Sequence, residues 1–194
     1  MNQSASGLHY IFPKRYADFV QRLRVVFGFV LLLGFAFLTA PTPASLAVGL
    51  PGSVLGLALR GWAAGHLAKD ARLATSGPYA YIRNPLYLGT LLAALGIVIA
   101  SRSLWLAIIF VVAFASIYLP AVELEEQHLL EIFPDYLAYA ARIPRFWPRT
   151  RWPGELRAFS WPLYRKNEEY KAVLGFLVAT GWLLWKCWLR STVT

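Results

Sequence analysis

Five long apolar blocks constrain the fold of this chain more than any other feature of its sequence. They cover residues 23–40, 44–62, 86–100, 104–121 and 172–189. Apolar residues in such blocks, rather than on one face of a helix, are typical of membrane spans of roughly 20 residues. Charged residues make up only 15% of the chain, below the roughly 25% usual in soluble domains. The sequence therefore predicts an all-α integral membrane protein with about five transmembrane helices.

The polar segments between these blocks predict one integral domain over residues 1–194. Residues 1–22 mix aromatic and basic side chains, as expected of a segment at the membrane interface. Residues 23–122 then hold four spans, with a tight turn expected at Ser101-Arg102-Ser103 between spans three and four. Residues 123–170 form a cap over a pocket, in which residues 123–142 are expected to be helical, and residues 171–190 form the fifth span. The long basic lead and long apolar run of the first block predict a retained span, not a cleaved signal peptide.

Basic residues are distributed unevenly between the two sides of this topology. When residues at the span edges are included, sixteen of the 19 lysines and arginines fall in the N-terminal segment and in the stretches between spans two and three and between spans four and five. An excess of this kind marks the cytoplasmic side. We therefore expect the N-terminus and the functional loops in the cytoplasm and the C-terminus on the opposite side. The net charge of +9 then indicates contact with anionic membrane lipids and not with nucleic acid.

Two polar clusters at the edges of the spans are candidates for a functional site. The first is the irregular stretch 77–89, which contains two prolines, Arg83 and Asn84 directly before an apolar run. Irregular backbone at membrane depth is tolerated only where protein or a wet cavity satisfies its polar groups. The second is the acidic cluster 123–126, which begins as span four ends. It is either a solvated helix start or one wall of a pocket, because ionisable groups near membrane depth usually line cavities.

The residue types of known catalytic and metal sites do not come together in this sequence. His66 and His128 are each isolated and Cys187 is the one cysteine, so no metal site is expected. Nucleophile motifs and the Gly-rich loops of soluble nucleotide-binding folds are also missing. From the residues alone, the prediction is a polar pocket with Arg83, Asn84 and Tyr87 on one side and Glu125 and Glu126 on the other. Its reaction is left open.

An ordered set of motifs resembles a known family. The run Arg83-Asn84-Pro85-Leu86-Tyr87-Leu88-Gly89 is similar to the R-H/N-P-x-Y-x-G motif of the isoprenylcysteine carboxyl methyltransferase and phospholipid methyltransferase superfamily. The preceding L-x-T-x-G-P-Y lead and the following E-E-x-x-L and P-R-F-x-P elements also match, so the resemblance covers roughly residues 60–150. Asn84 stands where the family usually has histidine. The family's F-G-x-x-Y element is Phe133-Pro134-Asp135-Tyr136 here, which is one residue short and lacks the glycine. Asn84 cannot titrate, which argues against acid-base chemistry there.

The resemblance implies a membrane methyltransferase that uses S-adenosylmethionine and acts on a lipid-like or isoprenylated substrate through a carboxylate or an amine acceptor. It implies catalytic roles for Glu126 and Arg83. The residues expected to bind the cofactor are Tyr79, Arg83, Asn84, Tyr87, Glu125, Glu126, Leu129, Arg145, Phe146 and Trp147. In this scheme the carboxylates bind the ammonium group or ribose hydroxyls of the cofactor, the basic and amide groups bind its carboxylate, and the aromatic and apolar side chains bind adenine.

Two other interpretations remain open at this level. One is an NADPH-dependent membrane reductase with a fold like that of the sterol reductases, whose cofactor phosphate would require several basic groups in the pocket. The other is a non-enzymatic membrane scaffold, in which the same polar residues would only belong to loops and to the interface. The sequence does not determine the oligomeric state.

Overall fold

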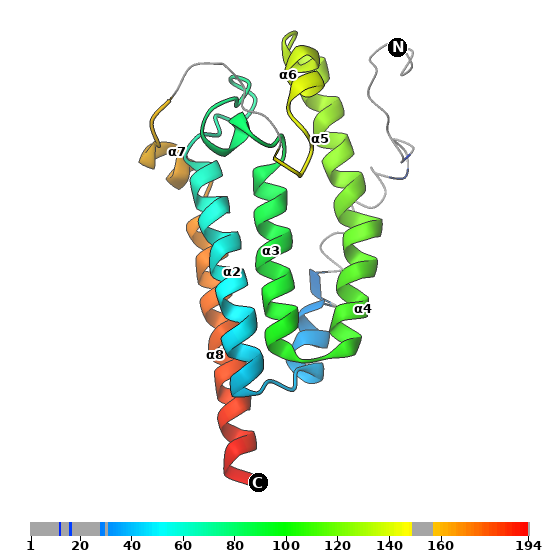
Figure 1. The fold of residues 1–194 in the computed structure, drawn as a ribbon, viewed down its shortest axis with the longest axis vertical. Helices are drawn as coiled ribbons and strands as arrows, with labels where there is room; N and C mark the ends of the chain where they lie inside the picture. The colour runs from blue at the N-terminus through cyan, green and yellow to red at the C-terminus, as the bar shows by residue number, and fades with distance from the viewer. Residues whose placement is uncertain (1–11, 13–15, 17–27, 30, 149–156, 194) are drawn as a thin grey trace.

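The computed structural model describes residues 12, 16, 28–29, 31–148 and 157–193, and this part of the chain is helical with connecting turns and no strand (Figure 1). Three helical stretches are long and apolar enough to cross a membrane, namely Pro43–Ala64, Leu104–Ile132 and Tyr170–Thr192. A fourth apolar helix, Pro85–Ser101, is shorter. These findings confirm the all-helical, membrane-type fold class, while the number of five spans stays a prediction.

The elements in chain order are α2 (Pro43–Ala64), η2 (Gly77–Ala80), α3 (Pro85–Ser101), α4 (Leu104–Ala113), η3 (Phe114–Tyr118), α5 (Leu119–Ile132), α6 (Tyr136–Arg142), α7 (Trp161–Lys166) and α8 (Tyr170–Val193). Residues 31–38, within the first predicted span, are also helical. Most of the predicted interfacial segment 1–22, and residues 23–27 of the first span, lie outside the described residues.

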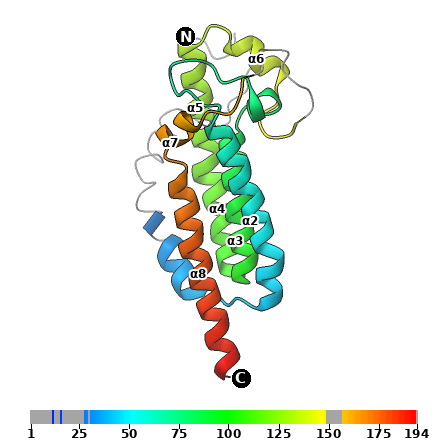
Figure 2. The ribbon, with the colours of Figure 1, turned by 90° about the vertical axis from the view of Figure 1, so that its left-hand side faces the viewer.

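The long helices run side by side, and α8 lies next to α2 in both views (Figures 1 and 2). The turns around η2 and the short helices α6 and α7 gather at one end of this bundle. The end of α8 lies beyond the opposite end. The loops that the sequence assigns to the cytoplasm are therefore at the other end of the molecule from the end of α8.

Small residues bring α2 and α3 into direct backbone contact. A Cβ atom added at Gly56 would lie 2.4 Å from the Ala93 nitrogen, and one at Gly49 would lie 2.4 Å from the Gly96 oxygen. The Ser53 hydroxyl, between these two glycines, donates to the Ala93 carbonyl at 2.8 Å. Close approach through small residues is the usual way that membrane helices associate. This contact fixes the position of α3 against α2.

We expect Gly56→Ala to destabilise the protein by about 1–3 kcal/mol or more, because the added methyl group meets backbone that cannot move aside alone. Gly52→Ala is the matched control. Its Cβ would have Gly96 Cα as nearest neighbour at 3.9 Å, so it should be neutral or slightly stabilising through helix propensity. Thermal unfolding of both variants in detergent measures the difference. Equal melting temperatures for the two variants would contradict this packing.

A π-helical segment interrupts the longest helix at η3, just before Pro120. Proline has no N–H to donate to the carbonyl four residues earlier, and its ring crowds that carbonyl. The carbonyl in question belongs to Ser116, and it accepts a hydrogen bond from the Tyr16 hydroxyl at 3.0 Å instead. The widened turn thus accommodates Pro120 without ending the helix, so α4, η3 and α5 form one continuous path from Leu104 to Ile132.

The helix expected over residues 123–142 is not continuous, which corrects the sequence-based prediction. Helix α5 ends at Ile132, Phe133 is extended with φ −121° and ψ 110°, and α6 begins at Tyr136. The cause is Pro134, because the residue before a proline is disfavoured in helical conformation. The break turns α6 back over the end of the bundle, where Tyr136, Tyr139 and Ile143 form a buried cluster.

The segment before α8 attaches to the end of α2 through polar contacts. The Asn167 side-chain amide donates to the carbonyls of Ala64 and Leu67, each at 2.9 Å, where α2 leaves carbonyls without helical partners. The backbone N–H of Ser160 donates to the Gly65 carbonyl at 3.0 Å. The predicted cap 123–170 therefore has two described parts, one around α6 and one around α7, and residues 149–156 between them are outside the described residues.

Candidate functional site

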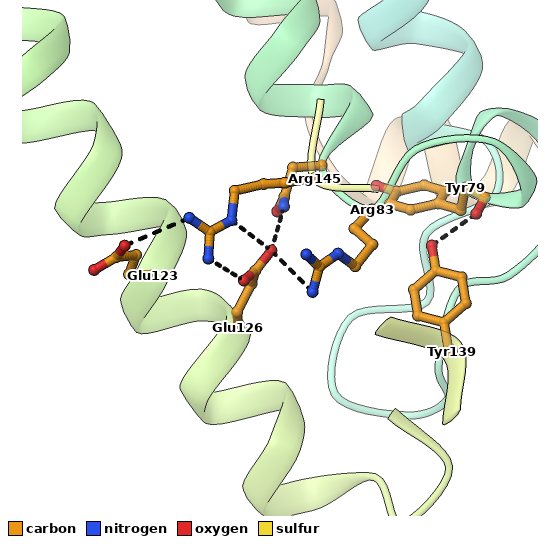
Figure 3. A network of polar contacts seen from close by, with 7 residues as sticks. Tyr79, Arg83, Glu123, Glu126, Tyr139 and Arg145 are labelled. Carbon is orange, nitrogen blue, oxygen red and sulfur yellow. Dashed lines mark hydrogen bonds and ion pairs between the residues drawn. The ribbon is translucent and has the colours of Figure 1, made fainter. Parts of the chain in front are cut away.

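A fully buried carboxylate, Glu126 on α5, is the centre of the polar network at the loop end of the bundle (Figure 3). The Asn84 amide donates to Glu126 Oε1 at 2.8 Å. Arg145 donates to both carboxylate oxygens, from Nη2 at 2.8 Å and from Nε at 3.2 Å. Arg83 Nη1 lies 3.6 Å from Oε1. Glu126 thus joins the turn before α3 to the turn after α6.

Arg145 also joins Glu126 to a second buried carboxylate, Glu123, one turn earlier on α5. Its Nη1 lies 3.4 Å from Glu123 Oε1, and Glu123 Oε2 accepts a hydrogen bond from the Phe12 backbone N–H at 2.9 Å. Burial acts to lower the pKa of Arg145, but the hydrogen bond and charge of Glu126, with the charge of Glu123, outweigh it and the pKa is raised. Arg145 therefore remains a cation that neutralises these carboxylates.

Arg83 differs from Arg145 because its guanidinium is buried but incompletely hydrogen-bonded. Its side chain is only 10% exposed, and its Nε and Nη1 atoms have no hydrogen-bond partner among the described residues. Its backbone N–H donates to the Pro144 carbonyl at 2.9 Å, which fixes the turn. Buried polar groups in proteins are nearly always hydrogen-bonded, so the unpaired donors of Arg83 are available to a bound ligand.

The N-terminus of α3 lies beside this guanidinium. Asn84 is the N-cap residue, but its side chain makes no capping bond because it is bonded to Glu126. The first backbone N–H groups of a helix lack helical partners and favour anions. Because the side chain of its N-cap is engaged elsewhere, the start of this 17-residue helix adds donors to those of Arg83. Together they form a site suited to a carboxylate or a phosphate.

Both features face a cavity between η2, the start of α3, α5 and α6. Six of the predicted cofactor-binding residues line it, namely Tyr79, Arg83, Asn84, Tyr87, Glu125 and Leu129. The rest of the lining combines three charged residues of the loop between α2 and η2 with mostly apolar side chains. These residues are Leu67, Lys69, Asp70, Arg72, Leu73, Ala74, Pro85, Leu86, Phe133 and Tyr139. The sequence therefore identified much of this cavity.

The cavity is narrow. Its volume is about 70 Å³, whereas pockets that take small organic ligands typically have about 300–1,000 Å³. Beside it, Asp70 of the lining loop contacts His128 of α5, with 3.1 Å between Oδ1 and Nε2. Asp70 also has a left-handed backbone, with φ 55°. A ligand larger than a few water molecules requires this loop to move away from α5.

Two tyrosines of the motif region hold the cavity wall in place. The Tyr139 hydroxyl donates to the Tyr79 carbonyl at 2.7 Å (Figure 3). Burial raises the pKa of both phenols, so both stay protonated at physiological pH. Gly77, which precedes η2, has φ +60°, and a Cβ there would lie 2.7 Å from the His66 ring. The glycine of the G-P-Y element is therefore required by both conformation and space.

The structure places four of the predicted site residues away from the cavity lining. Glu126 and Arg145 lie behind it, in the buried network. Phe146 is half-buried and does not line the cavity, and Trp147 is 78% exposed. The adenine-binding role predicted for these two aromatic residues stays a prediction.

Sequence reasoning missed two partners of buried charges. Glu123 was part of the acidic cluster but was not selected, although its burial with Glu126 follows from their spacing of three residues on one helix face. Arg60 of α2 pairs with the buried Glu169, with Nη2 donating to Oε2 at 3.0 Å. These two residues are 109 positions apart, and no local pattern links them. Among the described residues, no group of three His, Cys, Asp or Glu side chains is placed to hold a metal ion.

Comparison with known proteins gives a family match and two curated relatives. Residues 52–136 match the family described as phospholipid methyltransferase. The chain is 37% identical over 110 residues to the cobalt-zinc-cadmium resistance protein CzcN of Cupriavidus metallidurans, which covers 56% of this chain and 51% of the relative. It is 39% identical over 109 residues to the nickel-cobalt-cadmium resistance protein NccN of Alcaligenes xylosoxydans xylosoxydans, and this alignment covers 55% of this chain and 51% of the relative. No solved structure matches significantly.

The chain spans about half the length of the curated relatives it matches. The matched family segment contains most of α2, the η2 turn, α3 and the whole α4–α5 path, and thus Arg83, Asn84 and both buried carboxylates of α5. The resemblance inferred from the motifs is confirmed. Residues 52–136 match the model of the phospholipid methyltransferase family, which lies within the isoprenylcysteine carboxyl methyltransferase-like superfamily.

Proposed function

We propose that this protein is a membrane methyltransferase that takes its methyl group from S-adenosylmethionine and transfers it to a lipid-like or isoprenylated substrate at the cytoplasmic face. The family match supports methyl transfer. The long apolar helices support a membrane location, and the uneven distribution of basic residues supports a cytoplasmic site. The names of the curated relatives concern metal resistance, and our proposal assigns no metal to this chain.

The observation that carries this proposal is the unsatisfied guanidinium of Arg83 in the cavity. S-adenosylmethionine carries a carboxylate, and a buried arginine with free donors beside an uncapped helix N-terminus is suited to bind one. Glu125 lines the same cavity and is suited to the ammonium group or the ribose hydroxyls. Leu73, Leu129 and Phe133 provide an apolar wall for adenine. The residues present thus fit each chemical part of the cofactor.

When bound, S-adenosylmethionine supplies an electrophilic methyl group on a sulfonium sulfur. The residues of the protein would then bind and orient the reactants and exclude water, which are the main contributions that a protein makes to such a displacement. Tyr79 and Tyr87 line the same cavity as Arg83. Glu126 would act by fixing Asn84, Arg83 and Arg145, and not by contacting the reacting atoms.

One observation favours a second candidate, the NADPH-dependent reductase. Lys69 and Arg72 line the cavity together with Arg83, and a phosphate-bearing nicotinamide cofactor requires several cations. Asp70 and Glu125 line it as well, and they oppose such a polyanion. The balance of charge favours a ligand with both a carboxylate and cationic groups, as in S-adenosylmethionine.

Equilibrium dialysis of the purified protein in detergent tests this proposal, with labelled S-adenosylmethionine and NADPH in parallel. We expect saturable binding of S-adenosylmethionine that its demethylated product, S-adenosylhomocysteine, competes away. NADPH should not compete at the same concentrations. Saturable NADPH binding without S-adenosylmethionine binding would favour the reductase, and binding of neither ligand would contradict both enzymatic proposals.

A further inference from the structure

A compact turn over residues 68–72 forms one wall of the proposed cofactor cavity. It lies in the loop between α2 and η2, and three of its residues line the cavity. The backbone N–H groups of Ala71 and Arg72 donate to the Ala68 carbonyl at 3.2 and 3.3 Å. We call residues 68–72 the rim turn. Because these hydrogen bonds lie within the rim turn, it can move as a unit without breaking them.

The segments on both sides of the rim turn are held in place. Before it, the Asn167 amide donates to the Leu67 carbonyl at 2.9 Å, and the side chain of His66 is buried. After it, Ala74 and Ser76 are buried. The three central residues of the rim turn are exposed by contrast. Local opening concentrates where buried contacts are few, so the rim turn is the part of this loop that can open the cavity.

A side-chain contact between Asp70 and His128 joins the rim turn to α5, with 3.1 Å between Oδ1 and Nε2. His128 follows the cavity-lining Glu125 by three residues, so the two share one face of α5. Within the part of the chain that the structure describes, no other side-chain hydrogen bond or ion pair holds the rim turn to another element. The Asp70 and His128 side chains are 55% and 48% exposed, and exposed pairs of this kind are weak.

This position of the rim turn leaves little space for a cofactor. The cavity volume of about 70 Å³ is well below the roughly 300–1,000 Å³ of sites for small organic ligands. The contact also holds Asp70 at φ 55°, a left-handed conformation that is less favourable for aspartate than for glycine. Entry of a cofactor and persistence of the Asp70–His128 contact are therefore mutually exclusive.

We propose that the Asp70–His128 contact is autoinhibitory, because it keeps the rim turn across the cavity and must break before S-adenosylmethionine enters. This inference rests on the proposed function for the identity of the ligand. If only the open state binds, the measured Kd is the intrinsic Kd divided by the open fraction. Loss of the contact raises the open fraction and so tightens binding. Loss of a side chain that merely supported the cavity would weaken binding instead.

The effect on binding is measured with His128→Ala, which removes the contact from the α5 side and leaves the rim turn unchanged. We expect the association rate constant of S-adenosylmethionine to rise about 1.5- to 5-fold, the equivalent of one exposed pair. The dissociation rate constant should stay unchanged, so the Kd should fall by the same factor. Gln127→Ala, at the adjacent position of α5, is the matched control and should change neither rate constant. Stopped-flow binding in detergent gives both values, and a weaker Kd in His128→Ala, or rates equal to the control, overturns the inference.

Asp70→Gly removes the same contact from the rim turn, and glycine readily adopts the left-handed backbone at this position. We expect Asp70→Gly alone to raise the association rate constant as His128→Ala does. Adding Asp70→Gly to His128→Ala should raise it no further, because two changes that remove one shared contact are not additive. A double variant whose rate rises by the product of the two single effects contradicts a shared contact.

A measurement without cofactor separates this inference from the proposed function. A thiol introduced in the cavity wall by Ala74→Cys, with Cys187→Ser to remove the native thiol, reacts with 4,4'-dithiodipyridine only when the cavity is open. His128→Ala should increase the reaction rate about 1.5- to 5-fold, and Gln127→Ala should leave it unchanged. Equal rates in all three proteins overturn the autoinhibitory contact. A faster reaction in His128→Ala supports it, and the absence of S-adenosylmethionine binding in the same proteins would then contradict only the proposed function.

Discussion

Glu126→Ala should cost about 3–5 kcal/mol of folding free energy, the loss typical when one partner of a buried ion pair is removed. The side chain is fully buried and accepts hydrogen bonds from Asn84 and from two nitrogens of Arg145. Its removal leaves Arg145 with Glu123 alone and leaves the buried Arg83 without a counter-ion. Because proteins are stable by only about 5–15 kcal/mol, we expect a large fall in melting temperature in detergent.

Two variants separate this effect from a general sensitivity to losing acidic residues. Glu126→Gln keeps the shape and an acceptor for Asn84 but loses the charge, so it should fall between wild type and Glu126→Ala. Asp135→Asn removes an exposed carboxylate at the start of α6 that makes no side-chain capping bond, and it should leave the free energy of unfolding within about 0.5 kcal/mol of wild type. If Glu126→Ala melted like Asp135→Asn, the network would not have the structural role assigned to it.

Arg83→Gln should weaken S-adenosylmethionine binding about 10- to 100-fold, the effect of one or two charge-assisted hydrogen bonds. Stability should suffer far less than in Glu126→Ala, because Arg83 is 3.6 Å from Glu126 and Arg145 still neutralises that carboxylate. Equilibrium dialysis gives the Kd, and thermal unfolding shows whether the fold is retained.

Lys69→Gln is the matched control for charge in this cavity. Lys69 also lines the cavity but is exposed at its rim, where solvent screens its charge. We expect its Kd for S-adenosylmethionine to stay within about threefold of wild type. If Lys69→Gln and Arg83→Gln weakened binding equally, the general positive potential of the loop, and not the buried guanidinium, would account for the affinity.

The sequence was informative where a single segment determines the local structure. Apolar blocks predicted the long helices, and Ser101-Arg102-Ser103 predicted the tight turn that the structure shows between α3 and α4, with Arg102 left-handed at φ 50°. The motif placed Arg83, Asn84 and Tyr87 at one cavity. Each of these depends on neighbouring residues, so composition and spacing were sufficient.

Prediction was less successful where distant residues determine the outcome. Glu125 and Glu126 are adjacent in sequence, yet successive positions on a helix point about 100° apart. Glu125 therefore lines the cavity, whereas Glu126 is buried behind it. The pairing of Arg60 with Glu169 depends on how α8 packs against α2, which no local pattern encodes. Pro134 could have predicted the helix break at Phe133, but the residues on either side have a helical pattern and a single helix was expected.

The most direct test of the central claim compares two ligands on two proteins. Decarboxylated S-adenosylmethionine lacks only the group that we assign to Arg83 and the start of α3. Wild-type protein should bind S-adenosylmethionine about 10- to 100-fold more tightly than the decarboxylated form, and Arg83→Gln should bind the two ligands with nearly equal affinity. If Arg83→Gln discriminated between the two ligands as strongly as wild type, the carboxylate would bind elsewhere and the proposed cofactor site would be wrong.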